Sequence, residues 1–208
     1  LSTMVVFKNE IREILRGLLD FKINDHTQFS IKIIISMIPA ILVGLFFQNQ
    51  IEALFSKNLV LVGVMLLFTA MILFLADRAR DTQKKVTFSN AFVLGIVQAI
   101  AILPGISRSG STIASAVLLG IDRQKATRFS FLMVLPLIFG SMAKTIIDSE
   151  GTPQNSNITI LAIGFISAFI SGIVACKWMI TIVKKSQLRY FSYYCIFVGV
   201  ITLIYGLF

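Results

Sequence analysis

The sequence predicts an all-α protein that crosses a membrane several times, and three observations support this fold class. First, 56% of the 208 residues are hydrophobic and only 14% are charged, whereas a soluble domain is roughly 45–50% apolar and about 25% charged. Second, several apolar stretches approach the ~20 residues that a helix needs to cross a bilayer. Third, the basic residues behind the net charge of +9 stand in short clusters between those stretches. This pattern is typical of membrane proteins and does not favour nucleic-acid binding.

The apolar stretches predict five nearly complete membrane spans. They lie at 29–47, 59–76, 129–147, 158–176 and 193–208. Residues 1–7 read LSTMVVF and look like the last part of a further span, so we expect the chain to be a fragment. Cys176 and Cys195 both lie in hydrophobic runs, which indicates neither a disulfide framework nor a metal site.

The connecting segments predict the orientation, because short cytoplasmic loops are rich in Lys and Arg. Four segments are basic, namely 8–22, 77–90, 121–128 and 181–192. Segments 48–58 and 148–157 hold a single lysine between them. We therefore expect the basic segments to lie on the cytoplasmic side.

Segment 91–120 lies between two basic segments, so both of its ends are expected on the same side of the membrane. It contains apolar pieces of 13 and 9 residues around the polar turn PGISRSGS. At about 1.5 Å per residue, the longer piece reaches only ~20 Å into a hydrocarbon core of ~30 Å. The sequence therefore predicts a re-entrant helical hairpin that enters from the cytoplasmic side and has its tip deep in the membrane.

The span directions predict a single integral membrane domain, 1–208, built from inverted-topology repeats. The spans after the hairpin run opposite to those before it, so we expect 1–90 to be an incomplete first repeat and 91–208 the second. Inverted repeats whose broken helices meet near the midplane are a known membrane architecture. The symmetry predicts another hairpin, which would precede residue 1 and enter from outside.

Arg108 is the only basic residue in the predicted hairpin tip, and ionisable residues at membrane depth are functional candidates. Its guanidinium group matches the oxygens of phosphate or carboxylate. Pro104 is expected to end the first half-helix. Gly105 and Gly110 allow a tight turn and a close approach of the backbone to a ligand.

The start of the second half-helix supplies further groups for an oxyanion. Ser111 or Thr112 is expected to cap this helix. The hydroxyls of Ser107, Ser109 and Thr112, with free amides and the positive dipole end, predict a site for a phosphate-like group. Gln98 in the first half-helix could bond either a ligand or the opposing hairpin.

Two alternatives stay open at this point. Arg108 could instead bond backbone carbonyls at the broken helix, with the serines as packing residues. An anion site at a hairpin tip also fits a transporter or lipid flippase that moves an anionic group without hydrolysing it. His26, the sole histidine, stands in NDHTQ and is interpreted as a solvated loop residue.

The stretch QAIAILPGISRSGSTI, followed by FSFLMVLPLIFG, resembles the undecaprenyl-diphosphatase family of the bacitracin-resistance type. IPAILVGLFF at 38–47 also looks like this family, and the span layout agrees over essentially the whole chain. The family signature is matched in full at Pro104, Gly105, Ser107, Arg108, Ser109, Gly110 and Thr112.

The resemblance implies a multi-pass enzyme of the bacterial plasma membrane, with a site open to the extracytoplasmic face. It would hydrolyse undecaprenyl diphosphate to undecaprenyl phosphate and phosphate, recycle the lipid carrier for peptidoglycan synthesis and confer bacitracin resistance. By position, Arg108, Ser107 and Thr112 would be the catalytic set. The diphosphate-binding set would be Gly105, Arg108, Ser109, Gly110, Ser111 and Gln98.

The resemblance also implies a divalent cation, Mg²⁺ or Ca²⁺, that would neutralise phosphate charge. The implied partners are a polyprenyl diphosphate and membrane lipids, without nucleic acid, and a homodimer stays open. In the family another hairpin carries paired glutamates, a serine and a histidine, and residues 1–28 hold no such arrangement. The nucleophile and metal ligands are therefore expected outside this sequence, which leaves an inactive fragment as a third alternative.

The predicted orientation can be tested with tags. A tag fused to the C-terminus is expected on the extracytoplasmic side, because the last span runs outward. A second tag, inserted in the basic segment 181–192, is expected on the cytoplasmic side. Protease protection in oriented membrane vesicles reads both positions, and the reverse arrangement would contradict the assignment.

Overall fold

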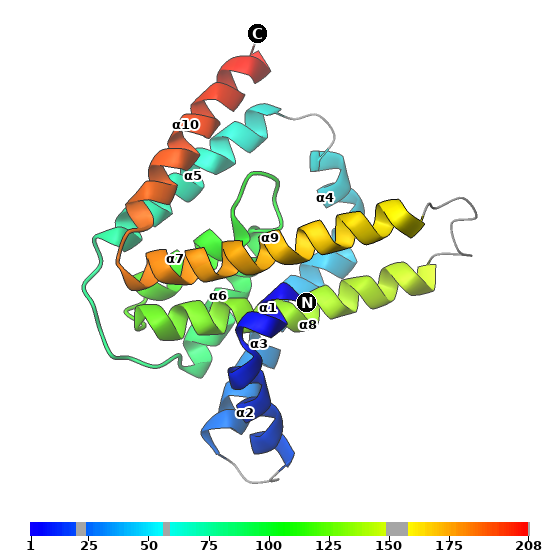
Figure 1. Cartoon of the computed structure of the whole chain (residues 1–208). Helices are drawn as coiled ribbons and strands as arrows, with labels where there is room; N and C mark the ends of the chain where they lie inside the picture. Colours follow the sequence, from blue (N-terminus) through cyan, green and yellow to red (C-terminus); the bar gives the residue numbers. More distant parts are fainter. Residues whose placement is uncertain (20–23, 56–58, 149–157, 208) are drawn as a thin grey trace.

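The computed structural model describes residues 1–19, 24–55, 59–148 and 158–207, and within these ranges the chain is almost entirely α-helical (Figure 1). The helices are α1 (Ser2–Val6), α2 (Lys8–Leu19), α3 (Asp25–Phe46), α4 (Gln48–Phe55), α5 (Leu59–Asp77), α6 (Phe88–Ile100), α7 (Arg108–Leu118), α8 (Arg123–Asp148), α9 (Ile158–Lys184) and α10 (Leu188–Leu207). The predicted all-α fold class is confirmed.

Five helices, α3, α5, α8, α9 and α10, are long and apolar enough to cross a membrane, which confirms the five predicted spans. Four of these helices extend well beyond the predicted spans. Helix α3 begins at Asp25, α8 at Arg123 and α10 at Leu188, and α9 continues to Lys184. Long basic side chains can reach polar surroundings while their backbone stays helical, so hydropathy marks the apolar part of a span and not its helical ends.

The predicted connecting segment 8–22 contains a helix that the sequence analysis did not predict, because its residues 8–19 form α2. Ile11 and Ile14 of this helix pack against the buried core. Residues three apart lie on the same side of a helix, so this short amphipathic helix is held by its contact with the rest of the protein. A prediction based on basic residues alone does not detect that packing.

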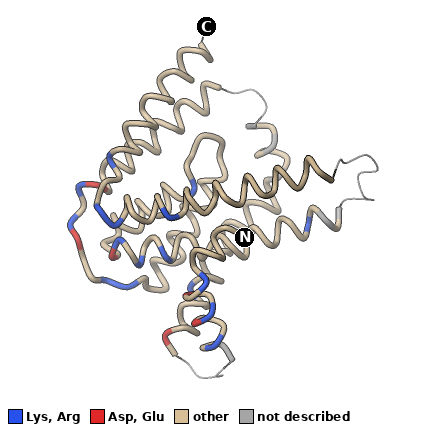
Figure 2. The backbone as a smooth tube through the Cα atoms, viewed as in Figure 1, with Lys and Arg blue, Asp and Glu red and all other residues tan. Residues whose placement is uncertain are grey.

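The predicted hairpin is present as α6 and α7, two short helices that pack against each other. The two flanks of the hairpin are joined directly, since the amide of Asp122 donates to the carbonyl of Lys84 at 3.1 Å. The hydroxyl of Thr82 also donates to the carbonyl of Gly120 at 2.5 Å. Figure 2 shows that most of the charged residues gather at this end of the bundle and on α2. The two basic flanks therefore lie on one side, as predicted.

Small residues set the closest helix contacts. Helices α5 and α10 run antiparallel along their whole length, with Gly63 against Gly199, and the hydroxyl of Ser192 donates to the carbonyl of Ala70 at 2.7 Å. Helix α3 packs on α6 where Gly95 meets the backbone of Ser36. In membranes such small residues allow backbones to approach closely. The contact between Ser36 and Gly95 therefore holds α6, the first helix of the hairpin, against α3.

Replacing Gly95 by leucine is expected to separate α6 from α3 and to lower the stability of the protein. A Cβ atom at this position would overlap the carbonyl group of Ser36, and overpacking typically costs about 1–3 kcal/mol. Gly44→Leu is the matched control, because a Cβ atom there meets nothing within 4 Å. Thermal unfolding in detergent should show a lower Tm for Gly95→Leu only; equal Tm values would contradict the contact.

Candidate functional site: the hairpin tip

The tip of the hairpin consists of the turns between α6 and α7. Helix α6 ends at Ile100, so the first half-helix stops four residues before Pro104, the residue that was expected to end it. Proline has no amide hydrogen for the carbonyl of Ile100, and the amide of Leu103 bonds that carbonyl instead, at 3.1 Å. The helix therefore tightens into turns before it reaches the proline.

Gly105 places the tip against α5. Its φ of +91° is a left-handed conformation that side-chain-bearing residues rarely adopt. A Cβ atom here would also lie 2.5 Å from the carbonyl oxygen of Val62. Both the turn and the contact with α5 require a glycine at this position.

Ser107 caps the start of α7. Its hydroxyl oxygen accepts a hydrogen bond from the amide of Gly110 at 3.2 Å, and a Cβ atom at Gly110 would lie 2.8 Å from that hydroxyl. The predicted caps, Ser111 and Thr112, were wrong because the helix begins earlier and both are buried inside it. The hydroxyl of Thr112 donates to the carbonyl of Arg108 at 2.9 Å.

Arg108 is the first residue of α7 and is exposed at the tip, as is Ser109. Among the described residues it makes no ion pair, and the first turn of α7 holds no acidic residue. The first amides of a helix lack partners within it and carry the positive end of the helix dipole. The guanidinium and these amides thus place uncompensated positive charge at one point, which is the arrangement that binds an oxyanion.

Thr69 belongs to the tip and was missed in the sequence. This buried threonine of α5 accepts a hydrogen bond from the amide of Ser107 at 3.3 Å, and its own hydroxyl donates to the carbonyl of Met65 at 3.0 Å. The only signal was a polar residue inside the apolar run LVLVGVMLLFTAMILFLAD. That signal does not reveal a partner 38 residues away.

Gln98 and Ser111 lie in the hairpin but are not at the exposed surface of the tip. Each is only 2% exposed, and neither side chain has a hydrogen-bond partner within the described structure. Leaving buried polar groups unpaired costs on the order of 1–3 kcal/mol each. These two groups therefore lie in the hairpin with unused hydrogen-bonding capacity, whereas Ser107, Arg108 and Ser109 come together at its surface.

His26 is not among the residues that form this tip. It was interpreted as a loop residue, but it is in the first turn of α3 and packs closely on Gly17 of α2. The described residues contain no group of three His, Cys, Asp or Glu side chains that could hold a metal ion. The donor set of the tip, hydroxyls beside a cationic guanidinium, does not fit a resident divalent cation, which prefers carboxylate oxygens.

The fold and the tip together define a polytopic α-helical membrane protein with a helical hairpin that exposes an arginine at the start of its second helix. The sequence matches the family described as bacitracin resistance protein BacA over residues 1–201. The chain belongs to this family.

Curated relatives agree with this assignment. The chain is 58% identical over 206 residues to the undecaprenyl-diphosphatase of Christiangramia forsetii, covering 99% of this chain and 78% of the relative. It is 47% identical over 207 residues to the undecaprenyl-diphosphatase of Bacteroides fragilis, covering 98% and 78%. Undecaprenyl-diphosphatase 1 of Bacillus cereus is 34% identical over 214 residues, covering 99% and 79%. The similarity therefore extends across several quite different organisms.

Thr69→Val is expected to weaken the tip, because it leaves the amide of Ser107 without its acceptor, at a cost of about 1–3 kcal/mol. Thr202→Val is the matched control, since the hydroxyl of Thr202 donates only to the carbonyl of Val198 within its own helix. Backbone amide exchange at Ser107 should accelerate in Thr69→Val and not in Thr202→Val. Unchanged exchange in both variants would show that Thr69 does not hold the tip.

Proposed function

We propose that this chain hydrolyses undecaprenyl diphosphate to undecaprenyl phosphate and phosphate. The observation that carries the proposal is Arg108, exposed at the start of α7 without a carboxylate partner among the described residues. Relatives up to 58% identical to the chain are named undecaprenyl-diphosphatase. The proposed role in the cell is recycling of the lipid carrier for peptidoglycan synthesis, with resistance to bacitracin, the property that names the family.

In the proposed mechanism, Arg108 binds the diphosphate and neutralises its charge. Hydrolysis adds water across the phosphoric anhydride, so negative charge develops on the bridging oxygen that leaves as undecaprenyl phosphate. A guanidinium fork and helix-start amides directed at these oxygens stabilise such charge. The exposed hydroxyl of Ser109 adds a hydrogen-bond donor beside Arg108.

The remaining residues of the tip have supporting roles in this proposal. Ser107 and Thr112 hold the first turn of α7 through the amide of Gly110 and the carbonyl of Arg108. Gly105 and Gly110 permit the turn and the cap. The proposed diphosphate-binding set is Gly105, Arg108, Ser109, Gly110, Ser111 and Gln98.

A divalent cation, Mg²⁺ or Ca²⁺, remains a proposal that rests on the family resemblance. When bound, such an ion would supply charge neutralisation to the diphosphate. The described residues do not provide a carboxylate site for it, so no step of the reaction is assigned to the ion, and Arg108 performs the charge neutralisation that this chain itself supplies.

We also propose that the site faces the extracytoplasmic side of a plasma membrane. The tip points away from the end that holds the basic loops, and basic loops favour the cytoplasm. The proposed division into repeats, 1–90 and 91–208, makes α5 and α10 equivalent, and their antiparallel packing at Gly63 and Gly199 supports it. A homodimer is compatible with this arrangement.

Arg108→Ala is expected to lower the rate of phosphate release from undecaprenyl diphosphate by about 10²–10³-fold, the effect of removing one donor to a developing oxyanion. Arg108→Lys is expected to recover only part of the rate, because lysine keeps the charge and loses the planar fork. The protein, expressed from its complete gene and purified in detergent, would be assayed for released phosphate.

Arg80→Ala is the control, since Arg80 is an exposed arginine of the basic end, outside the tip. It should retain the activity of the unsubstituted protein. Full activity in Arg108→Ala would contradict the role of the tip. Transfer of the lipid across vesicles without phosphate release would favour the flippase alternative over hydrolysis.

A further inference from the structure

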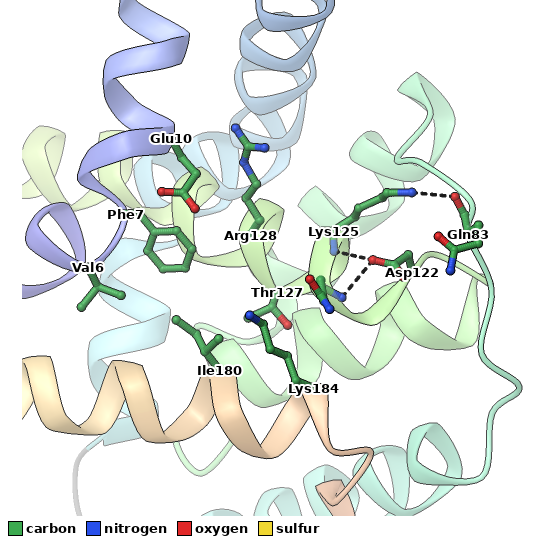
Figure 3. Close-up of a pocket in the computed structure, with 11 residues that line it drawn as sticks. Val6, Phe7, Glu10, Gln83, Asp122, Lys125, Thr127, Arg128, Ile180 and Lys184 are labelled. Atoms are coloured by element: carbon green, nitrogen blue, oxygen red, sulfur yellow. Dashed lines mark hydrogen bonds between the residues drawn. The ribbon is translucent and has the colours of Figure 1, made fainter.

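At the basic end of the molecule the structure holds a cavity of about 580 Å³. The junction of α1 and α2, the start of α8 and the end of α9 enclose it (Figure 3). Helix α7 has 11 residues, and at about 1.5 Å per residue it separates this cavity from the hairpin tip by roughly 16 Å. The cavity is therefore distinct from the site around Arg108.

Three cationic side chains line this cavity, namely Lys125, Arg128 and Lys184 (Figure 3). Lys184 has no hydrogen-bond or ion-pair partner within the described ranges. The amine of Lys125 donates to the carbonyl of Gln83 at 2.7 Å, which is a neutral acceptor and leaves its charge uncompensated. Arg128 lies 3.6 Å from Glu13, and its Nε atom is buried without a partner.

Two carboxylates, Asp122 and Glu10, also line the cavity. The carboxylate of Asp122 accepts from the amides of Gln124 and Lys125 at 3.1 and 3.0 Å and caps the start of α8, but these neutral donors leave its negative charge in place. The three lining cations still exceed the two lining carboxylates by one, and this positive excess favours an anion.

In Figure 3 the apolar side chains of the lining lie together on one side of the cavity, with Glu10 beside them, and Lys125 lies on the other side, near Asp122. Val6, Phe7 and Ile180 form the apolar side. Ile180 precedes Lys184 by about one turn of α9. Along the axis of this helix, an apolar side chain of the lining is therefore followed by a charged one. A phospholipid has the same order, with a charged phosphate followed by an apolar glycerol ester and acyl chains.

A neighbouring cavity of about 470 Å³ extends the positive surface. It shares Lys125 and Arg128 with the first cavity and adds Lys32 and Lys85. Asp25 is the acidic residue that lines this second cavity, and its carboxylate pairs with the amine of Lys85 at 3.1 Å. The charge pattern is thus a property of the whole basic end and not of one side chain.

We propose that the first cavity binds the phosphate group of an anionic phospholipid. Lys125, Arg128 and Lys184 surround the phosphate, and the start of the acyl chains lies against Val6 and Ile180. Basic pockets between membrane helices are known to bind lipid head groups in this way. The lipid is a bound ligand and not a substrate, so this inference is independent of diphosphate hydrolysis.

The test measures phosphatidylglycerol bound to the purified protein by native mass spectrometry, with phosphatidylcholine as the comparison lipid. The double substitution Lys125→Gln/Lys184→Gln removes two of the lining cations. Lys84→Gln/Lys185→Gln is the matched control, because it removes the same charge from adjacent lysines that do not line the cavity. We expect phosphatidylglycerol binding to fall about tenfold or more in the first variant, given the contribution of each cation, and to stay unchanged in the second.

Several results would overturn the proposal. Equal losses in both double variants would indicate unspecific attraction to the basic end, and no loss in either would show that the cavity binds no anionic lipid. Equal binding of phosphatidylcholine would remove the anionic preference, and displacement of the lipid by millimolar inorganic phosphate would assign the cavity to a free anion. If the double variant fails to fold, Lys184→Gln alone serves, because this lysine makes no hydrogen bond or ion pair with the described residues, and Lys185→Gln is then its control.

Discussion

The site depends on the contact between the hairpin tip and α5. A hairpin that does not cross the membrane has broken helix ends, and their backbone groups need partners where water is scarce. Thr69 supplies one by accepting from the amide of Ser107, and Gly105 lets the turn lie directly on Val62. Because these contacts hold the turn, Ser107 is in position to cap α7. The exposed position of Arg108 follows from that cap.

Arg108 differs in its surroundings from the other arginine near the hairpin, Arg123. Arg123 is buried at the base of the hairpin, where its Nε donates to Asp81 at 2.7 Å and its Nη2 to the carbonyl of Ala79 at 3.0 Å. Its charge is compensated, and its role is to join the α5–α6 connection to α8. Arg108 is exposed at the tip and has no carboxylate partner within the described chain. One arginine therefore stabilises the fold and the other is available for a ligand.

Much of the fold could be predicted because the membrane imposes simple local rules. Twenty apolar residues identify a span, and two basic flanks around a short apolar segment identify a hairpin. Both rules depend only on neighbours in the sequence. The parts that failed depend on contacts between distant residues. Helix α2 needs the core against which Ile11 and Ile14 pack, and Thr69 needs the tip that lies 38 residues away. The predicted cap at Ser111 or Thr112 was wrong for a related reason. The tight turns at the tip let α7 begin earlier, at Arg108.

Fixing both ends of the hairpin has a consequence for the chemistry. The base is held by the bond between Asp122 and Lys84, and the tip by the bond between Ser107 and Thr69. A donor that is already in position pays little reorganisation when charge develops on a substrate, and such preorganised donors are the most effective ones. A flexible loop with the same arginine would lose part of its binding energy in ordering itself. In the proposed reaction the apolar packing of α3, α5 and α6 therefore matters, because it fixes the start of α7, where Arg108 and the first helix amides lie.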